Sequence, residues 1–276
     1  MNRYEQFRQT AIDRGVPEDE AGRFAEHLRF AVWTDEARDG EEVVGQLGGL
    51  PRLPAGTEWP GALPFIGSVD CAALPLAEGL PLPADGSLLF FLHHEEDMEA
   101  VEDNDGESDY SLVLHVPAGV ETEVVASPRD PGSTTHFMEP LPFLLPERRI
   151  TAWVQPELPR WLENRDAEHQ PDAVKELLDE LKHVEQLRDL VGELWPAPGR
   201  GSSLRFGGYC SEHGSSDGPF TQMANGSDEQ RLVREWAVLA QFDTQSEFYY
   251  GCFLITLEDL AAQRFEAMRS FTMFTE

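Results

Sequence analysis

The amino-acid sequence predicts an α+β protein, mainly of antiparallel sheets, in which a β-rich unit occurs twice. Strand-like and helical segments come in blocks rather than in strict alternation, which favours α+β over α/β. Short apolar runs are separated by Gly, Pro and other turn residues through most of the chain. A series of Gly-Gly, strand and Asp elements also recurs in the second half of the sequence. With 276 residues, the chain is long enough to bury a large hydrophobic core.

Helical spacing characterises the N-terminal residues 2–36. Apolar side chains recur at this spacing over residues 4–11 and again over 24–31, and Pro17 stands where a second helix would begin. We therefore expect two helices in this region. The charged segment 34–42 is predicted to be a connector.

Short apolar runs bounded by turn residues dominate the next part of the chain. Such runs predict strands. The strand candidates are residues 43–44, 65–66, 88–92, 112–114, 124–125 and 150–154.

The segment 171–194 has a different pattern, because its apolar side chains keep a period of 3.6 residues and Pro171 stands at its start. We expect one long helix there. A β pattern then returns, and Thr256 begins a capping box for a final helix whose buried face would extend to Met268. The later strand candidates are residues 204–206, 236–242 and 248–255.

These patterns divide the chain into four segments. Each β-rich unit alone would expose an apolar sheet face, so we expect the two units to pack together as one domain. The segments are an N-terminal helical segment (1–42), a first β-rich repeat (43–165), a linking helix (166–198) and a second β-rich repeat with a C-terminal helix (199–276).

The two β-rich units share a series of elements. Each contains a Gly-Gly turn, an apolar strand that ends in Asp, and a Gly that opens another apolar strand. Gly-Gly permits backbone conformations with positive φ, and an Asp at a strand end can accept hydrogen bonds from turn amides. The match predicts an internal duplication. Its members are Gly48-Gly49, residues 65–70 and Gly86 in the first unit, and Gly207-Gly208, residues 238–243 and Gly251 in the second.

Several of these elements resemble the YwqG-like bacterial proteins. The opening signature of that family is similar to Gly-Gly-Leu-Pro-Arg-Leu-Pro at 48–54, closed by Glu-Trp-Pro at 58–60. The strand at 64–70, the Leu-Pro…Gly-x-Leu-x-Phe-Phe stretch at 82–91, Gly-Gly-Tyr at 207–209 and Leu-x-Gln-x-Asp at 239–243 follow in the same order.

The resemblance extends from about residue 43 to the C-terminus, with departures. Gly67 and Ser68 stand where the family usually has Ala-Gln, so only Gln241 retains that amide, and Cys210 replaces a Pro. The resemblance implies an α+β fold with an internal duplication. It implies no activity, because the family has no settled function. Some members look like neighbours or fusions of toxin–immunity systems, which is an association with immunity rather than a mechanism.

Acidity is the most unusual property of the composition. The chain has 51 Asp and Glu against 21 Lys and Arg, for a net charge of −30. Such a surface repels phosphate backbones and anionic lipids, so we expect neither nucleic acid nor membrane as a partner. A basic protein would be attracted instead. Alternatively, the acidity serves solubility alone.

Targeting signals and disulfide patterns are not found in the sequence. The N-terminus has no basic segment followed by an apolar core, and no run of about 18 apolar residues occurs. The odd number of widely spaced cysteines, Cys71, Cys210 and Cys252, argues against a disulfide scaffold. We therefore expect a soluble, cytoplasmic protein. Its oligomeric state does not follow from the sequence.

The segment 95–109 holds nine carboxylates and no basic residue. Counting from Gly106, the positions that a calcium loop reserves for carboxylate ligands are occupied by Val101 and Leu112, so a calcium site is not expected. The segment is interpreted as a solvated hairpin loop or, alternatively, as a docking surface for a basic protein. The candidate partner-binding residues are Glu95, Glu96, Asp97, Glu99, Glu102 and Asp103.

None of the candidate metal-binding or catalytic motifs in the sequence has all the residues that such a site needs. His93-His94 would diverge on a strand, and residues 210–213 offer too few ligands for zinc. Gly-Ser-Ser-Asp-Gly at 214–218 lacks the strand and helix that a nucleophile elbow needs. We predict no metal, no cofactor and no catalytic residue. If a small ligand binds, its natural site is a groove between the repeats, lined by Trp59, Asp70, Gln241 and Asp243. Alternatively, these residues only stabilise turns.

Two hypotheses about function follow. The first is a non-enzymatic acidic interaction protein, immunity- or antitoxin-like, that binds a basic protein through surface carboxylates. The second is a small-ligand-binding protein or enzyme with a site between the two repeats.

Overall fold

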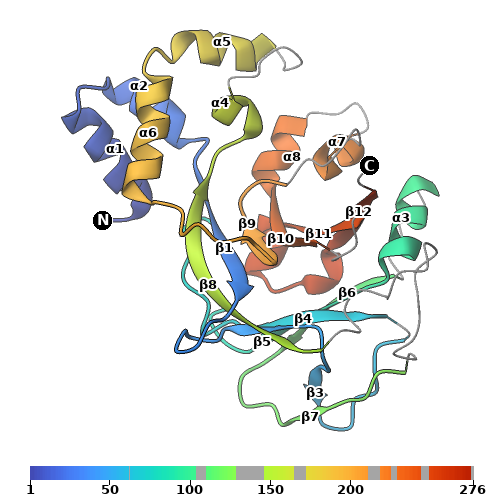
Figure 1. Ribbon diagram of the computed structural model, residues 1–276. Helices are drawn as coiled ribbons and strands as arrows, with labels where there is room; N and C mark the ends of the chain where they lie inside the picture. The colour runs from blue at the N-terminus through green and yellow to red at the C-terminus, as the bar shows by residue number, and fades with distance from the viewer. Residues whose placement is uncertain are drawn as a thin grey trace.

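A single large antiparallel sheet organises the molecule (Figure 1). The computed structural model describes residues 1–61, 63–103, 110–128, 146–164, 172–210, 218–224, 229–243 and 249–274. The strands of the sheet are β1 (Arg29–Glu36), β2 (Gly45–Leu47), β4 (Phe65–Asp70), β5 (Ser87–Leu92), β6 (Ser111–Val116), β8 (Arg148–Glu157), β9 (Leu204–Gly207), β10 (Trp236–Asp243), β11 (Tyr249–Thr256) and β12 (Arg269–Phe274).

The order of the strands is β12-β11-β10-β9-β1-β8-β2-β4-β5-β6, and each described pair is antiparallel. The long strands β1 and β8 pair at the centre, where Trp33 lies opposite Trp153. We call β2-β4-β5-β6 the first half-sheet and β9-β10-β11-β12 the second half-sheet. In each, the strands run in chain order from the centre to the edge. The α+β class predicted from the sequence is confirmed.

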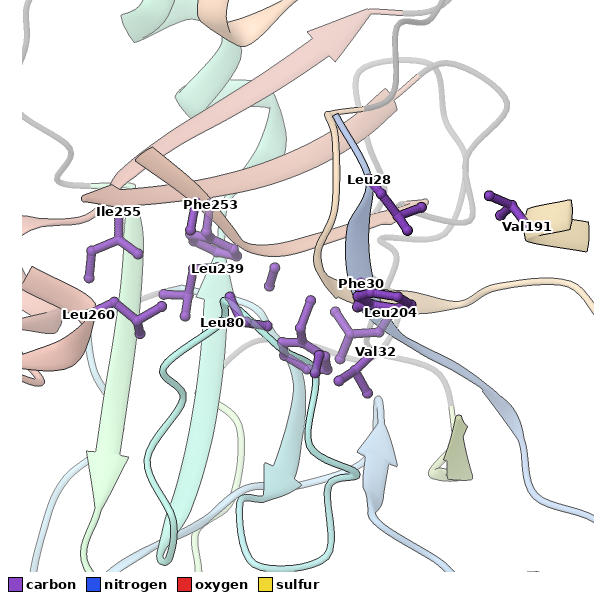
Figure 2. Close-up of a cluster of buried hydrophobic side chains, with 14 of the residues drawn as sticks. Leu28, Phe30, Val32, Leu80, Val191, Leu204, Leu239, Phe253, Ile255 and Leu260 are labelled. Atoms are coloured by element: carbon purple, nitrogen blue, oxygen red, sulfur yellow. The ribbon is translucent and has the colours of Figure 1, made fainter. Parts of the chain in front are cut away.

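The two half-sheets face each other across the main core (Figure 2). The ring centroid of Phe90 in β5 lies 5.9 Å from that of Phe206 in β9 and 5.7 Å from that of Phe253 in β11. The edges of the sheet also meet, because Ser111 of β6 donates a hydrogen bond to Ser270 of β12 at 2.7 Å. The sheet is therefore bent so that its inner faces bury each other.

Both half-sheets contain a β-bulge at the position that the repeat predicts to be equivalent. The register with the next strand shifts at Ile66 in β4 and at Leu239 in β10, and both side chains are buried in the main core. The last element of the repeat does not match, because Gly251 lies within β11 opposite Phe242, whereas Gly86 precedes β5. The strand order and the bulges agree with a duplication, which itself stays a prediction.

Different elements cover the outer faces of the two half-sheets. A two-stranded sheet of β3 (Arg52–Pro54) and β7 (Thr122–Val124) lies over the first, where Leu53 packs with Leu89 and Phe91. Helices α7 (Pro219–Ala224) and α8 (Glu229–Glu235) lie over the second, where Phe220 packs with Cys252. The outer face of the sheet is thus covered by a two-stranded sheet in the first half and by two helices in the second.

The remaining helices lie around the sheet. In Figure 1, α1, α2 and α6 gather at one end of β1 and β8, and α3 lies beside β12. None of the described helices is both long enough and apolar enough to cross a membrane. These elements are α1 (Arg3–Asp13), α2 (Glu18–Ala25), α3 (His94–Asp103), α4 (Arg160–Asn164), α5 (Asp172–Glu180), α6 (Val184–Leu194), α9 (Leu257–Ala261) and the 3₁₀-helix η1 (Phe265–Ala267).

Two helix predictions at the N-terminus and in the linker are wrong in extent. The second N-terminal helix ends at Ala25, and residues 29–36 form the central strand β1. The strands that flank β1, which are β8 and β9, come much later in the sequence, so the local sequence pattern does not predict this pairing. The linking helix is broken between α5 and α6, because the His183 amide donates to Glu20 of α2 at 2.5 Å.

The C-terminal helix is shorter than predicted. The expected cap is present, since the Thr256 hydroxyl accepts from the Asp259 amide at 3.0 Å. However, α9 ends at Ala261, and the chain goes on to the edge strand β12. Of the predicted buried face, Phe265 lies in the 3₁₀-helix η1 and Met268 lies between η1 and β12, and both pack against the main core.

Candidate functional site

A cleft of about 260 Å³ lies where the N-terminal helices meet segments of both halves of the sheet. The connection between β4 and β5 contributes one wall, and the end of β9 contributes the floor. The start of β10 and of α9 closes the remaining side. The polar or floor-forming members of the lining are Tyr4, Glu26, Arg29, Glu78, Gly208 and Trp236.

The floor of the cleft is the second Gly-Gly turn, in which Gly207 and Gly208 both have φ +74°. Left-handed backbone of this kind favours glycine. A Cβ atom on Gly208 would lie 2.1 Å from Oε2 of Glu157, so no larger residue fits there unless the glutamate moves. The floor of the cleft is therefore formed by glycine backbone, which lies directly against the carboxylate of Glu157.

Glu157 at the end of β8 anchors this turn. Its Oε1 accepts from Trp33 Nε1 at 2.7 Å and pairs with Arg205 Nη1 at 3.1 Å, and its Oε2 accepts from the Tyr209 amide at 2.8 Å. Burial raises the pKa of Glu157, while the charge of Arg205 acts in the opposite direction. The carboxylate is thus held by three donors from three different strands or turns.

Arg29 at the start of β1 ties the turn to the opposite side of the cleft. Its guanidinium donates to the Gly208 carbonyl at 3.2 Å and to the Val233 carbonyl. It also lies 4.6 Å from the centroid of the Tyr209 ring, whose hydroxyl donates to the His27 carbonyl at 2.8 Å. The hydrogen bonds of the Arg29 guanidinium therefore go to backbone oxygens, and they hold the Gly207-Gly208 turn in place.

Two polar side chains of the lining remain open toward the cleft. Within the described chain, the Tyr4 hydroxyl makes no hydrogen bond and the Glu26 carboxylate makes no ion pair. Burial raises the pKa of Tyr4, so it stays a neutral phenol. Glu78, by contrast, is paired with Arg3. With Leu28 and Leu80 as apolar wall, the cleft offers a phenol and one exposed carboxylate.

The structure places three of the four residues predicted for a small-ligand groove, and it does not bring these three together. Trp59 packs against Phe91 on the outer face of the first half-sheet. Asp70 is exposed, and its Oδ1 accepts from the Ala72 amide at 3.0 Å as a turn cap. Gln241 is buried near the second Gly-Gly turn. Asp243 ends β10, and its side chain lies outside the described part.

Gln241 is nevertheless close to the floor of the cleft. Its Nε2 donates to the Tyr209 carbonyl at 2.9 Å, and its Oε1 accepts from the Tyr250 hydroxyl at 2.9 Å. The amide that the resemblance marked in the second half therefore supports the turn after Gly208. Trp59, Asp70 and Gln241, whose side chains the structure describes, do not line the cleft itself.

The interpretation of residues 95–109 as a solvated loop is wrong for the described part. Residues 94–103 form α3, in which Glu95 and Asp97 are buried, Glu96 is half-buried and Glu99 is exposed. The side chains of Glu102 and Asp103, and residues 104–109, lie outside the description.

Asp97 is buried because β12 supplies hydroxyl donors to its carboxylate. Oδ2 accepts from Thr272 Oγ1 at 2.8 Å and Oδ1 accepts from Ser270, which in turn accepts from Ser111 of β6. Burial raises the pKa of Asp97 to about 6, despite these hydrogen bonds. The carboxylate thus joins α3 to both edge strands.

Metal and nucleophile motifs can be placed only in part. In the described part of the chain, no three His, Cys, Asp or Glu side chains gather as a metal site would require. His94 is buried at the start of α3, and His93 precedes that helix. The segments 211–213 and 214–217 lie outside the described residues.

Comparison with known families places most of the sheet, from β2 onward, in one family. A sequence profile described as a domain of unknown function (DUF1963) matches residues 45–271. The chain belongs to the DUF1963 family. No curated protein sequence matches it. The DUF1963 match begins at β2 and ends in β12, so Tyr4, Glu26 and Arg29 lie outside it although they line the cleft.

Sequence analysis marked the Gly-Gly turn as an element of the repeat, but it predicted neither the floor nor the walls of the cleft as a site. The Gly-Gly signal pointed to residues 207–208, whereas Arg29 and Glu157 carried no motif. Both are charged residues on strands that lie at the centre of the sheet. Only the strand order, which local pattern does not reveal, makes them neighbours of the turn.

Proposed function

We propose that this DUF1963 protein is a non-enzymatic binding protein whose cleft takes a small amphipathic cation, a primary amine on an apolar or aromatic body. The observation that carries the proposal is that a phenol and an exposed carboxylate, Tyr4 and Glu26, line the same cleft together with apolar walls. An ammonium group would bond to both polar groups, and the body would lie along Leu28 and Leu80.

The charges around the cleft support a cation rather than an anion. Arg3 is paired with Glu78, Glu157 is paired with Arg205, and the Arg29 guanidinium is held by backbone carbonyls at the floor, whereas Glu26 makes no ion pair within the described chain. The net charge of −30 also raises the local concentration of cations at the surface. The volume of about 260 Å³ is at the small end for ligand pockets, which typically hold about 300–1,000 Å³.

Calorimetric titration with two probes of the same body and opposite charge tests this function. Tryptamine should bind saturably with one site per chain, and indole-3-acetate should show no saturable binding. The proposal is wrong if the anion binds as well as the amine, or if neither binds while the protein is folded by circular dichroism.

We also infer that the acidic surface recognises a basic protein, as an acidic interaction protein in the cytoplasm would. The net charge of −30 and the exposed Glu99 on α3 support this second candidate. The YwqG-like resemblance and its immunity association belong to the same proposal. Affinity capture from the native cell should enrich basic proteins at low salt and release them at high salt. Captured proteins without a basic bias would contradict it.

A further inference from the structure

Two cysteines lie beside the floor of the cleft. Cys210 follows the Gly207-Gly208-Tyr209 turn, and its Sγ lies 3.8 Å from Sγ of Cys252 on β11. Both thiols are free. A disulfide requires a separation of about 2.05 Å, so the two sulfurs already touch and need only a small further approach. We propose that Cys210 and Cys252 form a reversible disulfide that ties the floor of the cleft to the second half-sheet.

The surroundings of the two thiols give them different roles. Cys210 is half-buried at the turn, while Cys252 is 1% exposed beneath it, packed with Phe220 and Phe271. Burial raises the pKa of Cys252 well above its usual value. Cys210 is therefore the thiol that meets an oxidant first, and Cys252 is the thiol that resolves the product.

A low-molecular-weight disulfide such as glutathione disulfide supplies the oxidant. The Cys210 thiolate attacks one sulfur of the glutathione disulfide, the S–S bond breaks and one glutathione thiolate leaves. Cys252 then loses its proton and attacks the Cys210 sulfur, which releases the second glutathione thiolate. Both protein protons end on the two glutathione thiols. Two cysteine thiols are oxidised, and one disulfide is reduced.

The third cysteine is placed differently. Cys71 is 5% exposed within the main core, and burial raises its pKa to about 12. In the first half-sheet, the positions corresponding to Cys210 and Cys252 are held by Pro51 and Leu89. The pair therefore belongs only to the half that carries the cleft.

Closing the disulfide would restrain the cleft, a consequence that rests on the proposed binding function. Cys210 lies two residues after Gly208, and the turn between them carries the bonds of Tyr209 to Glu157 and Gln241. The bridge would close a loop between residues 42 positions apart. Such a link restricts the unfolded chain and the mobility of the turn.

Peptide mass mapping of the full-length protein after treatment with glutathione disulfide tests the proposal. We expect one linked Cys210–Cys252 peptide, two hydrogens lighter than the reduced pair, and a Tm higher by on the order of 5 °C. Dithiothreitol should reverse both changes. Cys71→Ser should keep this response, and Cys210→Ser should lose it.

Other outcomes overturn the inference. Cys210 recovered only as a mixed disulfide with glutathione, or both cysteines recovered as free thiols, would contradict the bridge. If the bridge forms and tryptamine binds the oxidised and reduced proteins equally, the restraint on the cleft is wrong. If tryptamine binds neither form, the binding proposal fails while the mass and Tm results still stand for the disulfide.

Discussion

The two Gly-Gly turns of this protein are built alike but are stabilised by different chemistry. In the first half-sheet, Gln46 Nε2 donates to the Leu50 carbonyl at 3.2 Å. In the second, Arg205 Nη2 donates to the Tyr209 carbonyl at 3.3 Å. Both bonds run from a side chain to the carbonyl four residues later, directly after the glycines. The same type of turn is thus closed by a neutral amide in the first half-sheet and by a guanidinium in the second.

The difference shows how one scaffold acquires a site in only one of its halves. A buried guanidinium needs a compensating carboxylate, and Glu157 provides it. The carboxylate in turn allows only glycine at position 208, which leaves the open floor of the cleft. The neutral Gln46 needs no compensating carboxylate, and at the first turn a Cβ atom on Gly49 would instead lie 2.9 Å from Cβ of Glu147.

Removing Glu157 should have the largest effect. Glu157→Ala removes the carboxylate that pairs with Arg205 and that accepts from Trp33 and the Tyr209 amide, and it should lower the free energy of unfolding by about 3–5 kcal/mol. Gln46→Ala, the matched change in the first turn, should cost about 1 kcal/mol. Urea unfolding of both variants checks the asymmetry. Equal losses would show that the charge in the second turn does not matter for stability.

The bulges should respond alike in the two halves. Ile66→Ala and Leu239→Ala each remove a fully buried side chain from the main core and should each cost about 2–5 kcal/mol. The same urea experiment applies. A large loss for one and almost none for the other would break the equivalence of the half-sheets.

The contact that joins the two edges should depend on pH. The pKa of Asp97 rises from 3.8 to about 6 on folding, so the folded state holds this proton more tightly than the unfolded chain. Stability from this group is present below about pH 4 and is lost as the pH rises to about 6. The total is on the order of 2–3 kcal/mol.

Asp97→Asn isolates this contribution, because the amide cannot ionise and has nearly the same shape. The variant should gain stability relative to the parent by that amount between pH 4 and pH 7. Measurement of unfolding free energies at the two pH values checks this. A difference between the two proteins that stays constant with pH would contradict the assignment.

The smallest expected effect concerns the open carboxylate of the cleft. Glu26→Gln should weaken tryptamine binding about two- to fivefold, as the loss of a solvent-accessible charge pair predicts. Glu58→Gln removes the same charge from an exposed loop near the first half-sheet and should leave binding unchanged. Equal weakening by both variants would point to the overall charge instead of the cleft.

Local pattern predicted most strands but not their neighbours. The apolar runs at 65–66 and 88–92 are strands, because a short run between turns has few alternatives. β1 was missed, since a central strand buried on both sides has no period of two. Asp97 looked solvated because its donors on β12 lie more than 170 residues away. The cleft likewise joins six separate stretches of the chain, and of their lining residues only Gly207-Gly208 and Val238 belong to the shared elements of the predicted repeat.

Nuclear magnetic resonance of the glycine amides tests the central claim most directly. In ¹H–¹⁵N spectra of the labelled protein, saturating tryptamine should shift the amides of Gly207 and Gly208, which line the cleft, and leave those of Gly48 and Gly49 in place. Shifts at the first turn that equal those at the second, or no shift at Gly207 and Gly208, would contradict the claim that only the second half-sheet carries the binding site.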